Sequence, residues 1–309
     1  RGVSEPAAWT DRTRLSGNRR AAELQAELTA AFTLTESGPG TWRASHFTEG
    51  RGVVFGGQLL GQAVVAAARR FPDKRVRSVQ TLFARGVTFA GPVDIEVEAL
   101  HDGRTVADAT VSFVQGGRIC ARSLVLLDVA EPDLVRHQVP MPEVEPPDVA
   151  AARPHPLTAP QTIVVGGVDV QDPSLTGPAR LQLWVRFPDA PAPDGTHGGG
   201  LHRALVAHAT DGWLIATAMR PHPNLGQAMA HVEVSTGVLT QSLSFHDDVD
   251  ARGWLLIDHE ALVIGGGRSY GRGQVFTEDG RLVASFVQDA LLRAFPAGQD
   301  PRGRQKTIF

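Results

Sequence analysis

The sequence predicts an α+β fold made of two similar halves, each with one long buried helix and an antiparallel sheet that curls around it. Three observations lead to this prediction. An apolar helix opens each half, the strands and turns that follow recur in the same order, and helices do not alternate with strands as they do in a parallel doubly wound sheet. The 309 residues suffice for two domains of ordinary size.

The helices are the most distinctive elements. Gly57–Ala68 contains no charged residue, and Arg69 and Arg70 close it. Its counterpart, Leu201–Thr217, is also apolar apart from one arginine, its histidines and Asp211. Because a helix that is apolar nearly all round is buried on most sides, we expect both to lie at the centre of the fold.

The strands after each helix carry the evidence for an internal repeat. Val79–Leu82 resembles Thr240–Leu243, and Gly116–Ala121 resembles Asp279–Ala284 at nearly the same sequence offset. Duplication of a whole domain is the simplest account. The expected strands are Val93–Leu100 and Thr105–Gln115 in the first half, and Val238–Phe245, Trp254–Leu262, Ser269–Glu278 and Leu282–Leu292 in the second, with a last first-half strand after the Gly117-Arg118 turn.

Proline marks the joint between the halves, because most of the 21 prolines lie between residues 129 and 199. Strand-like Gln161–Val165 and Arg180–Phe187 interrupt this region. The predicted organisation is an N-terminal repeat over 20–130, a Pro-rich linker over 131–160, a C-terminal repeat over 161–295 that carries the candidate catalytic residues, and a tail over 296–309.

Composition excludes several classes of protein. With 30 basic and 33 acidic residues the net charge is −3, which argues against a nucleic-acid binder that neutralises phosphates. The single cysteine, Cys120, excludes an intramolecular disulfide. No uncharged apolar stretch reaches the roughly 20 residues that cross a bilayer, and no signal core opens the chain. We expect a cytoplasmic protein without membrane or nucleic-acid partners.

Two glycine-rich motifs do not indicate a site. Gly267–Gly271 matches the Gly-x-Ser-x-Gly nucleophile elbow, but a strand-like pattern follows it rather than a helix, so Ser269 is rejected as a nucleophile in favour of a hairpin turn. Gly198–Gly200 lacks the spacing of a phosphate-binding loop. The eleven histidines show no ligand spacing, so no metal and no cofactor are expected.

The candidate chemistry centres on Asp211 and Gln288. A carboxylate on an apolar helix face is costly unless it is partnered or used, and burial there raises its pKa toward that of a general base. The alternative is a carboxylate bonded to nearby backbone or to His208. Gln288 lies in an apolar strand row, where an amide either holds a water or is simply a satisfied core residue. The repeat offset maps Gln288 to Val125, so the second half alone carries both polar groups.

A third candidate is Thr240. On an ideal strand it shares a face with Val238 and Ser242, a row of small residues that leaves room for a ligand. The strand propensity of threonine accounts for it equally well. The Gly56-Gly57 start of the first helix supplies exposed N–H groups and a positive dipole end, which suit an oxyanion.

Several motifs resemble those of one enzyme family. Val54–Ala63 resembles the first-repeat helix signature of the acyl-CoA thioesterase II family, the double-hotdog thioesterases, and Ser242–His246, Trp254–Leu256 and Val275–Gln288 resemble its second repeat. The resemblance runs from about residue 45 to 293. It implies a double hotdog fold and hydrolysis of fatty acyl-CoA to free fatty acid and CoA.

The resemblance also implies site residues. Asp211 matches the family aspartate and Gln288 the family glutamine, which orient a water together with a Ser or Thr. That hydroxyl position falls on Val238, and Thr240 lies two residues further along the strand. CoA is expected along a surface partly lined by arginines, with Arg69, Arg70, Arg85, Arg268 and Arg272 as candidates.

Two other functions stay open at this point: a hotdog enoyl-CoA hydratase or dehydratase, and a non-catalytic acyl-CoA-binding protein. Pro221–Asn224 is the nearest approach to the hydratase loop and does not match its pattern. A homo-oligomer, dimer or tetramer, is expected because hotdog sheets commonly pair further.

Overall fold

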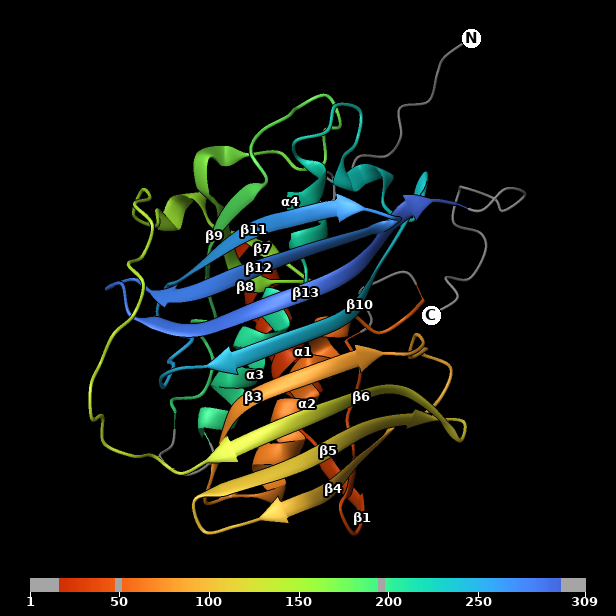
Figure 1. Ribbon diagram of the computed structural model, residues 1–309, viewed down its shortest axis with the longest axis vertical. Coiled ribbons are helices and arrows are strands. Elements are labelled where there is room, and N and C mark those ends of the chain that lie inside the picture. Colours follow the sequence, from red (N-terminus) through yellow and green to blue (C-terminus); the bar gives the residue numbers. More distant parts are fainter. Residues whose placement is uncertain (1–16, 48–51, 194–197, 296–309) are drawn as a thin grey trace.

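The computed structural model describes residues 17–47, 52–193 and 198–295, so the tail predicted over 296–309 lies outside the described part. Within the described residues one 13-stranded sheet runs through the molecule, with α2 and α3 on the face that we call inner (Figure 1). The strand order is β1-β2-β4-β5-β6-β3-β10-β13-β12-β11-β9-β8-β7, and the neighbouring strands pair antiparallel.

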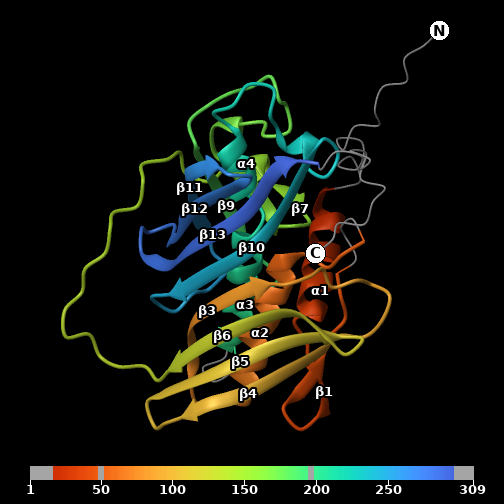
Figure 2. The same ribbon diagram turned by 45° about the vertical axis from the view of Figure 1, so that its right-hand side comes forward.

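The strands of each half stay on their own side of the sheet, and β3 and β10 join the two sides (Figures 1 and 2). The N-terminal strands are β1 (Thr35–Gly38), β2 (Thr41–Arg43), β3 (Arg75–Phe83), β4 (Asp94–Asp102), β5 (Val106–Gln115) and β6 (Arg118–Asp128). The C-terminal strands are β7 (Arg153–His155), β8 (Ala159–Val164), β9 (Arg180–Arg186), β10 (Val234–Phe245), β11 (Leu255–Gly265), β12 (Arg268–Thr277) and β13 (Leu282–Ala294). The strands predicted from the sequence are therefore present, with shifted ends, and β7 and β8 extend the sheet into the predicted linker.

The first central helix, α2 (Gly56–Arg70), forms as predicted. The single helix predicted over Leu201–Thr217 is wrong, because the chain forms α3 (Gly198–Thr210) and α4 (Leu214–Met219) with a bend between them. Gly212 lies in that bend, and a Cβ on it would come 3.2 Å from the carbonyl oxygen of Leu157. Close packing against a neighbouring loop therefore interrupts a segment whose local sequence favours a helix.

A further helix, α1 (Gly17–Ala31), was not anticipated from the sequence. Its buried Leu24, Leu28 and Ala31 recur at helical spacing and identify its apolar face. This helix packs against β7 and β8, the strands at the far edge of the sheet. An element from the start of the chain thus covers part of the C-terminal half.

Helices α2 and α3 contact each other directly on the inner face of the sheet. Gly61 of α2 lies at a close contact with α3, where a Cβ would come 2.4 Å from the ring of Phe32 and 2.9 Å from the carbonyl oxygen of Ala204. Only glycine fits there without movement of the neighbouring helix. Gly57, nearer the start of α2, makes a similar contact with the end of α3, since a Cβ there would come 2.6 Å from the carbonyl oxygen of His208.

The join between β3 and β10 is symmetric. Gln241 pairs with Thr81, Leu243 pairs with Val79, and Ser242 opposite Gln80 lies midway between these pairs. Gln241 and Val79 are thus equivalent about this midpoint. The repeat comparison matches Val79 to Thr240, one residue away from this register, and a slip of one residue exchanges the two faces of a strand.

Both strands also carry an irregularity at the equivalent place. Pairing with β6 shifts between Val76 and Ser78 of β3, and pairing with β13 shifts between Val238 and Thr240 of β10. The two pairs of residues lie at the same sequence offset as Val79 and Gln241. Each bulge bends its strand and inverts the alternation of side chains on either side of it.

The Pro-rich segment crosses the outer face of the C-terminal half. The side chain of Gln138 donates to the carbonyl oxygen of Gly280 at 2.7 Å, and the ring nitrogen of Trp184 donates to the carbonyl oxygen of Glu145 at 2.9 Å. Beneath it lies an apolar cluster on that face. The buried members of the cluster are Trp184, Trp254, Leu256 and Phe276.

Ser269 lies at the start of β12, directly after a hairpin turn formed by Gly266 and Gly267, whose φ angles are 61° and 76°. It is 4% exposed and is followed by a strand rather than a helix. The hairpin interpretation of this motif is confirmed.

We predict that Gly61→Ala lowers the free energy of unfolding by about 1–3 kcal/mol, because overpacking at the α2–α3 contact outweighs the helix propensity of alanine. Chemical denaturation measures the change. Gly91→Ala is the matched control, since nothing lies within 4 Å of a Cβ there. Equal stability of the two variants would contradict the close contact.

Candidate functional site

Asp211 occupies the bend between α3 and α4, at the end of α3 that meets the start of α2. Its side chain is buried, with the residue 4% exposed. A Cβ on Gly56 would lie 2.8 Å from Asp211 Oδ2, and a Cβ on Gly57 would lie 3.1 Å from Asp211 Cβ. Two glycines at the first turn of α2 therefore allow the carboxyl to sit against the helix end.

Gln288 meets Asp211 from the sheet. Its Nε2 donates to Asp211 Oδ1 and to the backbone carbonyl oxygen of Asp211, both at 3.1 Å. It also donates to Oε1 of Gln241 at 2.8 Å. Gln288 and Gln241 are directly opposite each other in β13 and β10, and both are buried. The structure thus brings together the acid and the amide that the sequence singled out, and adds a second amide.

A chain of hydrogen bonds fixes which way both amides point. The Thr210 hydroxyl donates to the carbonyl oxygen of Ala207 at 2.9 Å, so it accepts from Gln241 Nε2, also at 2.9 Å. Gln241 Oε1 then faces Gln288 and accepts from its Nε2. Gln288 Oε1 is left as a buried acceptor without a protein partner. A free buried acceptor beside a carboxyl is suited to hold a water.

Burial dominates the electrostatics of Asp211. Desolvation raises the pKa of its carboxyl from 3.8 to about 7, while hydrogen bonds from the backbone N–H of Gly57 and from Gln288 act in the opposite direction. The positive end of the α2 dipole also favours the ionised form. The carboxyl is therefore able to accept and release a proton near neutral pH.

Gly56 and Gly57, which the sequence suggested as an oxyanion site at the helix start, lie directly against Asp211. The N–H of Gly57 donates to the Asp211 carboxyl, and Gly56 is half-buried beside the ring of Phe83. The sequence left open whether the Asp211 carboxyl is bonded to nearby backbone or is used in chemistry. In the structure it is bonded to backbone at Gly57 and also contacts Gln288. His208 is buried and its pKa is lowered to about 3, so it is neutral.

Thr240 does not join this cluster. It is exposed, whereas its neighbour Gln241 is completely buried. The bulge at Leu239 inverts the alternation, so Val238, opposite the buried Ala290, lies on the inner face and Thr240 on the outer face. The expected face shared by Val238 and Thr240 is therefore wrong.

Ser242 lies on the outer face with Thr240, opposite Gln80 and Val287, and is half-buried. It does not line the space around Asp211. The hydroxyl connected to the site is instead that of Thr210, the residue before Asp211, which sequence reasoning missed. Gln241 was missed as well, although its place between Leu239 and Leu243 in an apolar strand row was a usable signal.

No group of three or more His, Cys, Asp or Glu side chains that could hold a metal ion occurs within residues 17–47, 52–193 and 198–295. Over the same residues, no helix is long and apolar enough to cross a membrane.

Comparison with protein families matches both parts of the chain. Residues 43–127 match the family model described as the acyl-CoA thioesterase N-terminal domain, and residues 136–292 match the acyl-CoA thioesterase C-terminal domain. Together the two matches include the helices α2 and α3 and the strands that carry Gln241 and Gln288.

Individual proteins are similar over most of their length. Human acyl-coenzyme A thioesterase 8 is 29% identical over 285 residues, which cover 82% of this chain and 85% of that protein. The crystal structure of an acyl-CoA thioesterase II, TesB2, from Mycobacterium marinum is 26% identical with a TM-score of 0.70, covering 88% of this chain and 98% of the other.

The fold also resembles a protein of unknown function with a hot dog fold from Alicyclobacillus acidocaldarius, at 19% identity and a TM-score of 0.66, covering 87% of this chain and 98% of the other. The chain has a hotdog fold that combines helices with a large antiparallel sheet.

We predict that stability depends on pH through Asp211. Because its pKa is higher in the folded than in the unfolded chain, its contribution is fully present below pH 3.8 and is lost as the pH rises toward 7. At about 1.4 kcal/mol per pKa unit, the shift from 3.8 to about 7 lowers the free energy of unfolding by up to roughly 4 kcal/mol between these pH values.

The asparagine in the variant Asp211→Asn cannot ionise. The stability of Asp211→Asn relative to the wild type should therefore be greater at pH 8 than at pH 4, and the difference should equal this amount. Urea denaturation of both proteins at the two pH values measures the difference. A stability difference that is the same at pH 4 and pH 8 would contradict the raised pKa.

Proposed function

Because the chain belongs to the acyl-CoA thioesterase family, we propose that it hydrolyses fatty acyl-CoA to a free fatty acid and CoA, with Asp211 as general base and Gln288 as the residue that orients the attacking water. The observation that carries this proposal is the contact of Gln288 Nε2 with Asp211 Oδ1 at 3.1 Å beside a buried, unpartnered Gln288 Oε1.

The water is held by two acceptors. One of its hydrogens points to the carboxylate of Asp211 and the other to Oε1 of Gln288, which leaves an oxygen lone pair free for attack. Because the water donates both of its hydrogens to these acceptors, its oxygen lone pair faces the thioester and it is oriented as a nucleophile. The pKa of about 7 at Asp211 supports this role, since a general base is most effective near the operating pH.

Attack on the thioester carbonyl forms a carbon–oxygen bond, and Asp211 takes a proton from the water. The tetrahedral oxyanion then collapses, the carbon–sulfur bond breaks, and the proton on Asp211 passes to the departing thiolate of CoA. A thioester has a good leaving group, so no covalent enzyme intermediate is needed. The first turn of α2 at Gly56 supplies the positive dipole end for the oxyanion.

Gly56 also controls the space beside the base. Because a Cβ there would lie 2.8 Å from Asp211 Oδ2, any side chain would occupy the position where water and carbonyl must meet. Gly56 is half-buried, which supports an approach for the thioester from the surface at the start of α2.

We further propose that the chain is a double hotdog, with an N-terminal repeat over 20–130, a linker over 131–160 and a C-terminal repeat over 161–295 that carries the catalytic pair. The symmetric β3–β10 join and the equivalent bulges in these two strands support this division. Strand β7 and the start of β8 fall inside the linker range, so the strands of the C-terminal side begin before residue 161.

A homo-oligomer, dimer or tetramer, is also proposed. Leu82 and Leu124, on the neighbouring strands β3 and β6, are 56% and 51% exposed on the outer face of the N-terminal half. On the outer face of the C-terminal half, by contrast, the linker packs over the apolar cluster that contains Trp184. The cytoplasmic location expected from the sequence stays a prediction.

We predict that Asp211→Asn lowers kcat by at least about 100-fold on acyl-CoA, and that kcat/KM of the wild type rises with pH through an apparent pKa near 7. Release of free CoA thiol measures turnover. Asp258→Asn is the matched control, because Asp258 is likewise a buried aspartate with a raised pKa but lies on β11.

Near-normal turnover by Asp211→Asn would exclude the proposed base. The same assay separates the other two functions: loss of enoyl absorbance without free thiol would indicate a hydratase, and binding without either change would indicate a non-catalytic acyl-CoA-binding protein.

A second prediction compares the neighbours Thr240 and Gln241. Gln241→Leu removes the acceptor that orients Gln288, so kcat should fall by roughly 10–100-fold with little change in KM. Thr240→Val should stay within about twofold of the wild type, since Thr240 is exposed on the outer face. A large loss of kcat in Thr240→Val together with normal kcat in Gln241→Leu would instead support Thr240, the residue chosen from the sequence, as the third member of the site.

A further inference from the structure

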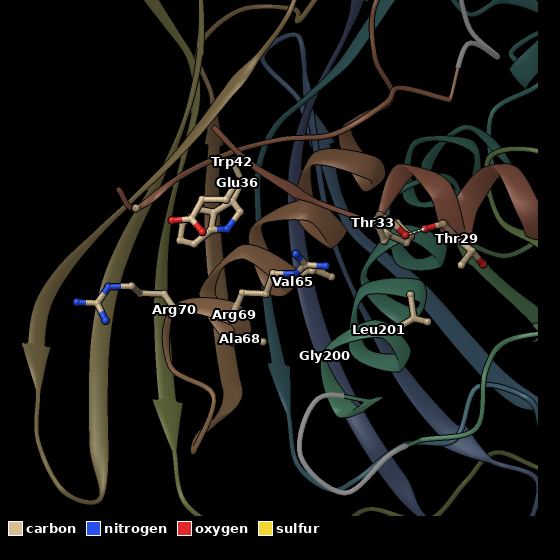
Figure 3. Close-up of a pocket in the computed structure, with 12 residues that line it drawn as sticks. Thr29, Thr33, Glu36, Trp42, Val65, Ala68, Arg69, Arg70, Gly200 and Leu201 are labelled. Atoms are coloured by element: carbon tan, nitrogen blue, oxygen red, sulfur yellow. Dashed lines mark hydrogen bonds between the residues drawn. The ribbon is translucent and has the colours of Figure 1, made fainter. Parts of the chain in front are cut away.

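A cavity of about 700 Å³ opens at the opposite end of the α2–α3 pair from Asp211. It lies between the end of α2, the start of α3, the end of α1 and the β1–β2 hairpin (Figure 3). Its volume is within the range of roughly 300–1,000 Å³ that is usual for small-molecule sites. The apolar lining residues are Phe32, Trp42, Val65, Ala68 and Leu201.

The two ends of the helix pair are equivalent. At one end, Gly57 of α2 packs against Asp211 after α3. At the other, Gly200 of α3 packs against Ala68 of α2, where a Cβ on the glycine would lie 3.1 Å from the Cβ of Ala68. Gly57 and Gly200 lie at the same sequence offset as Ala68 and Asp211. The helix pair therefore has an approximate twofold axis, and exchange of the halves carries Asp211 onto Ala68.

The sheet shares this symmetry. The β3–β10 join makes Val79 the equivalent of Gln241. Val79 pairs with Val125, and Gln241 pairs with Gln288. Val125 is therefore the equivalent of Gln288. By this symmetry an alanine and two valines take the positions of the acid and the two amides, and of these three residues Ala68 lines the cavity. Neither Ala68, Val79 nor Val125 can accept a proton or hold a water.

The lining of the cavity indicates what it binds. Arg69 and Arg70 contribute two cations at its edge against the single acid Glu36, and Figure 3 shows the two arginine side chains extending in opposite directions from the end of α2. Both arginines are exposed. An apolar cavity with cations at its rim suits a ligand that joins an acyl chain to phosphate groups.

We propose that this cavity is a second binding site for CoA thioesters, related to the catalytic site by the internal twofold axis, which holds its ligand without hydrolysing it. The proposal rests on the proposed function for the class of ligand. It follows that each chain binds two thioester molecules and turns over one of them.

The test uses S-decyl-CoA, a thioether that lacks the carbonyl and cannot be hydrolysed. Isothermal titration of the full-length wild type should give two thioether molecules per chain. Ala68→Phe, which fills the cavity, should reduce this number to one and leave the rate constant for hydrolysis at the Asp211 site within about twofold.

Arg70→Glu provides a second variant at an exposed position that does not disturb the helix packing, and it should weaken the second site by at least about tenfold. Arg118→Glu is its matched control, with the same change of charge at the exposed β5–β6 hairpin, and should bind two thioether molecules as the wild type does.

One thioether per chain in the wild type would overturn the proposal, as would two sites that neither Ala68→Phe nor Arg70→Glu affects. Hydrolysis of decanoyl-CoA by the same preparation keeps the two proposals separate. Its absence would contradict the proposed function, whereas a second thioether site that Ala68→Phe removes would still support binding in the cavity.

Discussion

The burial of the Asp211 carboxyl between the first turn of α2 and the amide of Gln288 is the constraint on which the rest of the site depends. Removing the carboxyl from water raises its pKa to about 7, and only nearby donors make that burial tolerable. The donors come from Gly57 on one half and Gln288 on the other. The acid is therefore held between the first turn of α2 and strand β13, two elements far apart in the sequence.

The close approach of the two helices makes this arrangement possible. Glycines at positions 57 and 61 let the backbone of α2 come close to the backbone of α3, and Gly56 leaves space for the Asp211 carboxyl. At the same junction the chain bends after Thr210, where Gly212 packs against the loop at Leu157, and this bend takes Asp211 out of a regular helix. A stabilising helix contact and a destabilising buried acid are thus produced by one arrangement, which is the usual compromise between stability and activity at an enzyme site.

The second amide extends this arrangement into the sheet. The Thr210 hydroxyl donates to the carbonyl oxygen of Ala207, so it must accept from Nε2 of Gln241. Oε1 of Gln241 then accepts from Nε2 of Gln288, which leaves Oε1 of Gln288 as a buried acceptor without a protein partner. Val238 lies on the inner face of β10 opposite Ala290, and the Thr210–Gln241 pair supplies the polar contacts on this side of the site. The equivalent positions at the other end of the helix pair are apolar, so one end of the fold is equipped for chemistry and the other has an open cavity.

The sequence by itself determined the family, the α+β class, helix α2, the succession of strands along each half, and the choice of Asp211 and Gln288 as candidates, because apolar periodicity and repeated motifs are local properties of the chain. The tertiary structure alone decided the break after Thr210, the docking of α1 on β7 and β8, and the faces of β10. The inner position of Gln241 and the outer position of Thr240 follow from a bulge at Leu239. A bulge depends on how β13 pairs with β10, and ideal alternation along one strand contains no information about its partner.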